Sequence, residues 1–230
     1  FASFKLSHNP PIGNMPQFEN TTHMQELNLD DFAETALLPA DTTVTPTPLK
    51  IIRSETFDDF VNELTPSDQQ WLNRQSFTGK TGQIAWLENG QGIIGSSGED
   101  SLSTLGHLPY QLPEGVYRLT DDASFIALLG WGLGGYRFDR YKLADRMPAK
   151  LILPDSANAS ELVHTIKATN LSRDLINTPA QDMAPSHLQA EVEALAETFA
   201  AEVNTTVGDE LLDLECGAIH AVGRAAADGP

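Results

Sequence analysis

The sequence is poor in cysteine, in positive charge and in long apolar runs, and each shortage narrows the class of protein. Its one cysteine, Cys216, has no second cysteine with which to form an internal disulfide, which suits a reducing cytoplasm. No apolar run approaches the ~20 residues of a membrane-spanning helix. The amino terminus also lacks the basic-then-apolar order of a secretory signal. We therefore expect a cytoplasmic protein without a membrane partner.

Positive charge is the second shortage. Lysine and arginine number 14 against 32 aspartates and glutamates, so the formal net charge is -18. Such a chain repels a phosphate backbone, and we expect no nucleic-acid partner. The acidic residues are spread along the chain and not gathered in a tail, which is typical of a solvated surface. With 230 residues, 40% of them hydrophobic, the chain is long enough for a core in one large or two modest domains.

The short motifs that carry hydrolytic or phosphate-binding chemistry are missing as well. Neither His-Glu-x-x-His nor Gly-x-Ser-x-Gly occurs, and Gly-Lys-Thr at residues 79–81 lacks the upstream glycine of a phosphate loop. No two histidines lie three to five residues apart, so no pair has the spacing of metal ligands. The six histidines are His8, His23, His107, His164, His187 and His220. No residue is therefore assigned a catalytic, cofactor-binding or metal-ligating role.

Several reactive residues have an ordinary structural explanation. His220 stands among apolar neighbours and is interpreted as a hydrogen-bonded core or interface histidine, and Cys216 as a small core residue. Acidic pairs occur mostly where helices or turns are expected to begin, where carboxylates answer unpaired N–H groups and the helix dipole. These pairs are Asp30 and Asp31, Asp58 and Asp59, Glu99 and Asp100, Asp121 and Asp122, and Asp209 and Glu210.

The amino-terminal two thirds of the chain predicts short strands alternating with helices. Thr65 and Pro66 have the chemistry of a helix cap and first position, with Trp71 and Leu72 expected to face the core. An Asn-Gly pair at residues 89–90 predicts a hairpin between two apolar runs. Further strands are predicted at residues 49–52, 116–119 and 151–153, and helices at 29–37, 57–64 and 101–108.

A glycine-rich run follows the strand at 116–119. It contains Gly130, Gly132, Gly134 and Gly135, at the end of an apolar helix that Asp121 or Asp122 is expected to cap. The order is not Gly-x-Gly-x-x-Gly, and the run follows an apolar helix where a phosphate loop should follow a strand. We interpret these glycines as a surface for close helix packing.

The carboxyl-terminal part predicts a helix, a proline turn and a second helix. Ser160 is expected to cap the first helix, whose apolar residues lie on two flanks, and Pro179 forces the helix to end near Asn177. The second helix is expected to begin at Pro185. Its apolar residues form one stripe that predicts a buried face: Leu188, Val192, Leu195 and Phe199. A strand is expected at 202–207, and short helices at 210–214 and 218–222.

Four stretches together resemble the leucyl (cytosol) aminopeptidase family. Residues 170–183 read Asn-Leu-Ser-Arg-Asp-Leu-Ile-Asn-Thr-Pro-Ala-Gln-Asp-Met, and 217–223 read Gly-Ala-Ile-His-Ala-Val-Gly. Upstream, 77–83 read Phe-Thr-Gly-Lys-Thr-Gly-Gln and 135–142 read Gly-Tyr-Arg-Phe-Asp-Arg-Tyr-Lys. The resemblance covers residues 48–223. Arg173 and Asp174 lie in the first stretch and are expected to have a structural role, with contact to the outer part of an active centre as the alternative.

The resemblance implies an α/β fold with two domains. Residues 1–47 are an extension or linker, 48–147 a small mixed α/β amino-terminal domain, and 148–230 the beginning of a catalytic peptidase domain. One departure is Ala184, where family members commonly have a serine or threonine that caps the helix; Asp182 is a possible substitute. Met24 is a plausible native start, since the resemblance begins only after it.

The resemblance also implies an activity that these residues do not carry themselves. The family removes amino-terminal residues from peptides with two divalent metal ions, Mn or Zn, and forms hexamers. Its metal ligands lie in a Gly-Lys-Gly…Asp-Ser-Gly-Gly segment and an Asn-Thr-Asp-Ala-Glu-Gly-Arg segment, and neither occurs in this sequence. We therefore expect no bound metal and no activity from these 230 residues alone. The alternative is a non-catalytic interaction module or a macro-like module that binds a nucleotide derivative.

Overall fold

The structure is a computed structural model that describes residues 3–4, 27 and 29–226. The chain divides into two compact units, one of residues 24–172 and one of residues 1–23 with 173–230. Helix α6 (Ala159–Asn177) begins in the first unit and ends in the second. Among the described residues, no helix is both long and apolar enough to cross a membrane.

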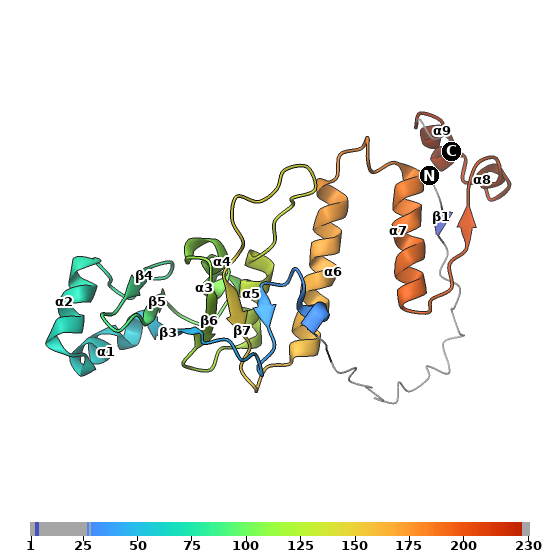
Figure 1. Cartoon of the computed structure of the whole chain (residues 1–230). Helices are drawn as coiled ribbons and strands as arrows, with labels where there is room; N and C mark the ends of the chain where they lie inside the picture. The colour runs from blue at the N-terminus through green and yellow to red at the C-terminus, as the bar shows by residue number, and fades with distance from the viewer. Residues whose placement is uncertain (1–2, 5–26, 28, 227–230) are drawn as a thin grey trace, which may run out of the picture. The chain divides into compact units, whose positions relative to one another are not determined.

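A six-stranded sheet organises the unit of residues 24–172 (Figure 1). Its strands lie in the order β2-β7-β6-β3-β5-β4, and every neighbouring pair is parallel except β4 with β5. Parallel neighbours require crossovers, and helices supply them. The predicted α/β fold class is thus confirmed. The strands are β2 (Leu37–Leu38), β3 (Thr47–Arg53), β4 (Ile84–Trp86), β5 (Gly92–Ser96), β6 (Val116–Leu119) and β7 (Lys150–Ile152).

Short helices connect the strands. Between β3 and β4 lie η2 (Ser54–Thr56), α1 (Phe57–Glu63) and α2 (Pro66–Arg74); between β5 and β6 lie α3 (Leu102–Leu105) and α4 (Leu108–Gln111); between β6 and β7 lies α5 (Phe125–Gly134). The predicted start of α2 is confirmed, because the Thr65 side chain accepts a hydrogen bond from the Asp68 N–H. The predicted hairpin is confirmed by antiparallel β4 and β5, with Gly90 at a φ of 85° between them.

Two apolar clusters form the core of this unit. The larger one packs α5 and α6 against the sheet, with Trp131 and Ile166 among its fully buried members. The smaller one lies between α2 and the β4–β5 hairpin and includes Leu72, which is 2% exposed. Trp71 was expected to face the core beside Leu72 and is 40% exposed, so that expectation is wrong. Trp71 and Leu72 point about 100° apart around the helix axis, and only Leu72 joins the smaller apolar cluster.

Helix α5 packs through its glycines, as predicted. A Cβ built on Gly130 would overlap the carbonyl oxygen of Leu102, and one on Gly134 would overlap that of Gly106. The predicted cap is wrong: Ser124, not Asp121 or Asp122, accepts the hydrogen bond from the Ala127 N–H. The glycines therefore let the backbone of α5 lie directly against the α3 segment.

Residues 29–38 do not form the helix that was predicted at 29–37. A 3-10 helix, η1 (Leu29–Phe32), forms there, and residues 37–38 form strand β2 beside β7. Glu34 and Ala36 have positive φ values of 64° and 54°, which turn the chain between the two elements. Pairing with β7 buries Leu37 to 1% exposure, a gain that a solvent-facing helix cannot offer. Sequence periodicity carries no information about a strand partner that lies so far along the chain.

The unit that contains residues 173–226 has α7 (Pro185–Thr198), β8 (Thr205–Thr206), α8 (Glu210–Asp213) and α9 (Gly217–Gly223). Strand β8 pairs antiparallel with β1 (Ser3–Phe4) and is shorter than the predicted strand at 202–207. The predicted helix end at Asn177 and start at Pro185 are confirmed. The predicted burial of the α7 stripe is wrong, because Leu188, Leu195 and Phe199 are 42%, 45% and 71% exposed.

Candidate functional site

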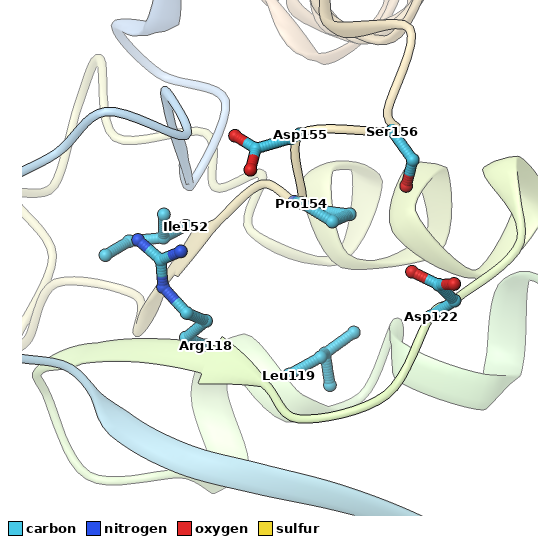
Figure 2. Close-up of a pocket in the computed structure, with 7 residues that line it drawn as sticks. All are labelled: Arg118, Leu119, Asp122, Ile152, Pro154, Asp155 and Ser156. Atoms are coloured by element: carbon cyan, nitrogen blue, oxygen red, sulfur yellow. The ribbon is translucent and has the colours of Figure 1, made fainter.

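A pocket of about 320 Å³ opens beyond the carboxyl ends of strands β6 and β7 (Figure 2). Leu119 and Ile152, the last residues of these strands, lie at its base. The loops that follow contribute the rest of its lining: Asp122 after β6, and Pro154, Asp155 and Ser156 after β7. In parallel sheets, ligands characteristically bind outside the carboxyl ends of the strands, so the pocket is a candidate binding site. We call it the β6–β7 pocket.

Local sequence explains why polar groups collect here. Ile152 is 1% exposed within the sheet, and Pro154 then ends the strand because it has no N–H for a further ladder bond. Asp155 and Ser156 follow on the exposed loop. Arg118 is half-buried on β6, and its guanidinium donates a 3.2 Å hydrogen bond to the carbonyl oxygen of Ala40. The head group is thereby held at the pocket.

The charged groups of the pocket are open to a ligand. Ion pairs within the described part of the chain include those of Lys50 with Asp121, Arg53 with Asp100, Arg137 with Asp145 and His220 with Asp209. None of them involves the three charged side chains of the pocket, Arg118, Asp122 and Asp155. Figure 2 shows Arg118 on one side of the space, with Asp122 and the Ser156 hydroxyl on the other. The arrangement offers one positive and two negative groups across a small space.

The described residues do not form a metal-binding set. No three His, Cys, Asp or Glu side chains converge among residues 3–4, 27 and 29–226. His107 Nδ1 lies 3.0 Å from the Ser103 carbonyl oxygen, and His164 Nδ1 lies 3.3 Å from Ser160 Oγ. His8 and His23 lie outside the described residues. The side chains present here do not fit the two-metal centre that the resemblance implies.

His220 is hydrogen-bonded, as expected. Its Nε2 lies 3.1 Å from Asp209 Oδ1, and its side chain is 13% exposed. Cys216 was expected in the core and is only half-buried, because it lies in the turn just before α9, with Sγ 3.4 Å from the Leu214 carbonyl oxygen. Neither residue lies near the β6–β7 pocket in sequence, and neither joins a group of possible metal ligands.

The Gly-Lys-Thr run at 79–81 has a structural use that explains why it is not a phosphate loop. The Gln83 side-chain oxygen accepts hydrogen bonds from the N–H groups of Thr78, at 2.9 Å, and Lys80, at 3.1 Å. Gly79 has a φ of 72° and lies against the Phe57 ring. The N–H groups that a phosphate would need are thus already used by the protein.

Among the acidic pairs, Asp100 has a specific partner. Its carboxylate lies 2.8 Å from Arg53 Nη2 and accepts a 3.3 Å hydrogen bond from the Ser124 N–H. Burial pushes the pKa of Asp100 upward, but the hydrogen bonds from Arg53 and Ser124 outweigh it and hold the pKa below its usual value. Asp58 and Asp59 lie in the first turn of α1, and Glu210 in that of α8, as expected.

Sequence reasoning missed the function of Asn170, the first residue of the 170–183 stretch. Asn170 is 7% exposed, and its Nδ2 donates a 3.2 Å hydrogen bond to the carbonyl oxygen of Glu34, the residue with positive φ. An asparagine in mid-helix has low helix propensity, which is the signal that was available. The backbone carbonyl oxygen of Asp174 accepts hydrogen bonds from the N–H and the hydroxyl of Thr178 at the end of α6. The structural role expected of the Arg173 and Asp174 side chains stays a prediction.

Ala184, the residue before α7, has no side-chain acceptor and makes no side-chain capping hydrogen bond. The Ala184 N–H instead donates a 3.2 Å hydrogen bond to His187 Nδ1. His187 thereby supplies the half of a capping box in which the third helical residue reaches back. The suggestion from the sequence that Asp182 substitutes as an acceptor stays a prediction, and this return bond from His187 was missed.

Two family models match the chain, one after the other. Residues 47–154 match the M17 aminopeptidase amino-terminal domain, and residues 170–230 match the catalytic domain of the cytosol aminopeptidase family. The pocket-lining residues from Arg118 to Pro154 lie within the first match, and Asp155 and Ser156 lie just after it.

Two curated relatives match parts of the chain. The chain is 37% identical to Peptidase B of Cronobacter sakazakii over 73 residues, which are 30% of this chain and 17% of that protein. It is 31% identical to a probable cytosol aminopeptidase of Geobacter sp. over 114 residues, which are 44% of this chain and 23% of that protein. The matches thus span less than a quarter of the length of either relative.

Solved structures share the fold over most of the chain. The crystal structure of cytosol aminopeptidase from Coxiella burnetii matches with a TM-score of 0.74 and 31% identity, over 84% of this chain and 44% of that one. The bottromycin maturation enzyme BotP in complex with Mn matches with a TM-score of 0.61 and 20% identity, over 80% of this chain and 43% of that one. At 20% identity the second match speaks for the fold alone.

Proposed function

Because the chain belongs to the M17, or cytosol, aminopeptidase family, we propose that it is the amino-terminal part of a metal-dependent enzyme that releases amino-terminal residues from peptides. The observation that carries this proposal is the order of the two family matches along one chain. The likeness to the Coxiella burnetii enzyme over 84% of this chain supports it. A leucyl preference is part of the proposal and comes from the motif resemblance.

The domain limits are proposed from the same resemblance. Residues 1–47 are a linker or extension, 48–147 the amino-terminal α/β domain and 148–230 the beginning of the catalytic domain. The proline at 148, in a stretch without regular structure before β7, is compatible with a linker at this place.

The proposed enzyme holds two divalent ions with side chains outside the described residues. The described residues offer no convergent set of ligands, and the chain spans under half of the structural relatives. Mn is the metal named with BotP, and Mn or Zn is proposed here on that basis and on the motif resemblance. We assign no step of the reaction to any residue of this chain.

The apolar surface of residues 173–226 supports a catalytic domain that continues beyond them. Large apolar side chains are exposed along α7, α8 and the segments between them: Leu188, Leu195, Phe199, Val207, Leu212 and Leu214. Exposed apolar groups in such density are typical of a surface that another part of the protein covers. We propose that the remainder of the catalytic domain covers it, in a cytoplasmic homo-oligomer, hexameric by resemblance.

Peptidase assays on two proteins test the proposal. The full-length protein encoded with this chain is expected to hydrolyse leucine p-nitroanilide, to lose that activity in EDTA and to regain it with Mn²⁺ or Zn²⁺. The 230-residue chain is expected to be inactive under the same conditions. A full-length protein without metal-dependent hydrolysis would refute the assignment, and metal-activated turnover by the 230 residues would refute the location of the ligands.

Sedimentation tests the proposed assembly separately. The full-length protein is expected to sediment as a hexamer of identical subunits. A monodisperse monomer with full peptidase activity would reject the assembly and leave the enzymatic proposal intact.

A further inference from the structure

We propose that the β6–β7 pocket binds a free aliphatic α-amino acid in its zwitterionic form. At about 320 Å³ the pocket lies at the lower end of the range for small-molecule sites, which suits a ligand of a few heavy atoms and not a nucleotide or a peptide. Its position beyond the carboxyl ends of two parallel strands is where such folds bind ligands. The ligand class follows from the charges and the apolar floor.

Arg118 is the group that receives the ligand's carboxylate. A guanidinium presents its N–H donors in a planar fork that matches the two oxygens of a carboxylate. The hydrogen bond to the Ala40 carbonyl uses one Nη2 donor, and no carboxylate of the described residues lies within ion-pair distance of this side chain. The remaining donors are therefore left for a bound anion.

The opposite side of the pocket suits an ammonium group. Asp122 and the Ser156 hydroxyl lie across the space from Arg118, whereas the Asp155 carboxylate lies on the Arg118 side (Figure 2). An α-ammonium has three N–H donors, and the Asp122 carboxylate with the Ser156 hydroxyl provides acceptors for them. The positive and negative sides thus correspond to the two charged groups of one amino acid.

The apolar lining accounts for the side chain of the ligand. Leu119, Ile152 and Pro154 form the base and wall of the pocket and offer no hydrogen-bonding side-chain groups. Leu119 and Pro154 are half-buried and supply most of the accessible apolar surface, because Ile152 is only 1% exposed. A branched aliphatic side chain such as that of leucine gains from leaving water there, at roughly 25 cal/mol per Å² of apolar surface.

The same charges disfavour the nucleotide-derivative alternative. Two aspartates against one arginine give the lining a net negative charge, and a diphosphate brings further negative charge into it. The proposed enzyme releases free amino acids, so the ligand would belong to its product class. This biological meaning rests on the proposed function, whereas binding itself does not.

Isothermal titration calorimetry of the 230-residue chain with L-leucine and its analogues tests the proposal. L-Leucine is expected to bind saturably. Leucinamide lacks the carboxylate, N-acetyl-leucine lacks the ammonium and glycine lacks the side chain, so each is expected to bind at least tenfold more weakly. Leucine that does not bind, or analogues that bind equally well, would overturn the proposal. ADP-ribose binding more tightly than leucine would replace it with the nucleotide-derivative alternative.

Two pocket variants and a neighbouring control locate the site. Arg118→Gln and Asp122→Asn are each expected to weaken leucine binding at least tenfold, whereas Asp121→Asn, which removes a carboxylate paired with Lys50 outside the pocket, is expected to leave it unchanged. Equal binding by all three variants would place the ligand elsewhere. The analogue series decides the question if Arg118→Gln unfolds. Peptidase activity is not measured in either experiment, so their failure leaves the proposed function standing.

Discussion

The two regions, residues 24–172 and residues 173–226, differ in how far their apolar side chains are buried. In the first region α5 lies within the larger core cluster, and Trp131 is fully buried there. In the second region α7 has no buried residue, and among the described residues beyond 172 the only apolar side chain of the core is Leu211. Both helices carry apolar residues, so composition does not separate them. What differs is whether the described chain supplies a surface on which the helix packs.

The cause of the difference is visible in the side chains of the two helices. Helix α5 has glycines where the α3 segment approaches, so the two backbones lie against each other. The Trp131 indole N–H on α5 donates hydrogen bonds to the carbonyl oxygens of Ala36, at 3.1 Å, and Ala149, at 3.2 Å. Helix α7 presents Leu188, Leu195 and Phe199 to solvent. The first region therefore has a packed core, and the second exposes apolar side chains along α7. Variants that act on one region and spare the other test this contrast.

The largest expected effect comes from truncating one aromatic side chain in each region. Trp131→Ala removes a fully buried ring and is expected to cost about 3–5 kcal/mol of unfolding free energy. Phe199→Ala removes a ring that is 71% exposed and is expected to stay within about 0.5 kcal/mol. Urea unfolding followed by circular dichroism measures both. Similar losses would erase the contrast, and a costly Phe199→Ala in the full-length protein alone would show that the remainder covers α7.

The next test adds a methyl group to α5 at a glycine that packs against the α3 segment. Gly134→Ala would place Cβ against the Gly106 carbonyl, and we expect a loss of about 1–3 kcal/mol from this overpacking. Helix propensity alone predicts the opposite sign, a gain of up to about 1 kcal/mol. Gly115→Ala is the control, because its Cβ would meet Tyr117 no closer than 3.6 Å. Thermal unfolding that shows Gly134→Ala to be as stable as the control would contradict the close packing.

Acid unfolding tests an ion pair of the first region. The pKa of Asp100 is held below its usual value because hydrogen bonds from Arg53 and Ser124 outweigh the effect of burial, so its carboxylate stabilises the fold above about pH 4, the ordinary carboxyl pKa. This contribution is lost as the pH falls through the lowered pKa. Asp100→Asn is expected to be less stable at pH 7, with the difference from the parent shrinking below about pH 4.

The neighbouring acid provides the control for that series. Glu99 is exposed, so Glu99→Gln makes the same carboxyl-to-amide change beside Asp100 without removing the bond to Arg53. Melting temperatures between pH 2 and 7 compare the three proteins. Parallel curves for Asp100→Asn and the parent would mean that the ion pair makes no pH-dependent contribution.

The smallest expected effect concerns the start of α7. Ala184→Ser restores a hydroxyl at the cap and is expected to stabilise the helix by about 1 kcal/mol. Ala194→Ser, at an exposed position inside the same helix, is expected to be neutral or slightly destabilising, because serine has lower helix propensity than alanine. Hydrogen exchange of the first-turn amides measures both. Equal protection in the two variants would show that His187 already satisfies this end.

The sequence predicted those parts of the fold that depend on near neighbours. The Thr65 cap, the Asn-Gly hairpin and the proline-bounded ends of α6 and α7 all use residues within a few positions of one another. One error is local, since Ser124, two or three residues after Asp122 and Asp121, is the cap of α5. Another arises where a distant partner decides, because residues 37–38 become a strand beside β7.

The candidate pocket was beyond the reach of sequence reasoning for the same reason. Arg118 and Asp122 precede Asp155 and Ser156 by more than thirty residues, and only the parallel pairing of β6 with β7 brings them to one edge. The available signal was polar residues directly after two predicted strands. Asp121 and Asp122 were interpreted as helix caps, and Asp155 and Ser156 were given no role, because the strand order was unknown.

The sequence by itself determined the family, the alternation of helices and strands and most element ends, because motif order and capping chemistry are properties of the chain. Only the tertiary structure decided the order of the strands, the burial of α5 against the exposure of α7, and the pocket beyond β6 and β7. A side chain is buried only when another part of the chain packs against it, and a pocket forms only when two segments meet. A local sequence pattern describes just one of the two partners.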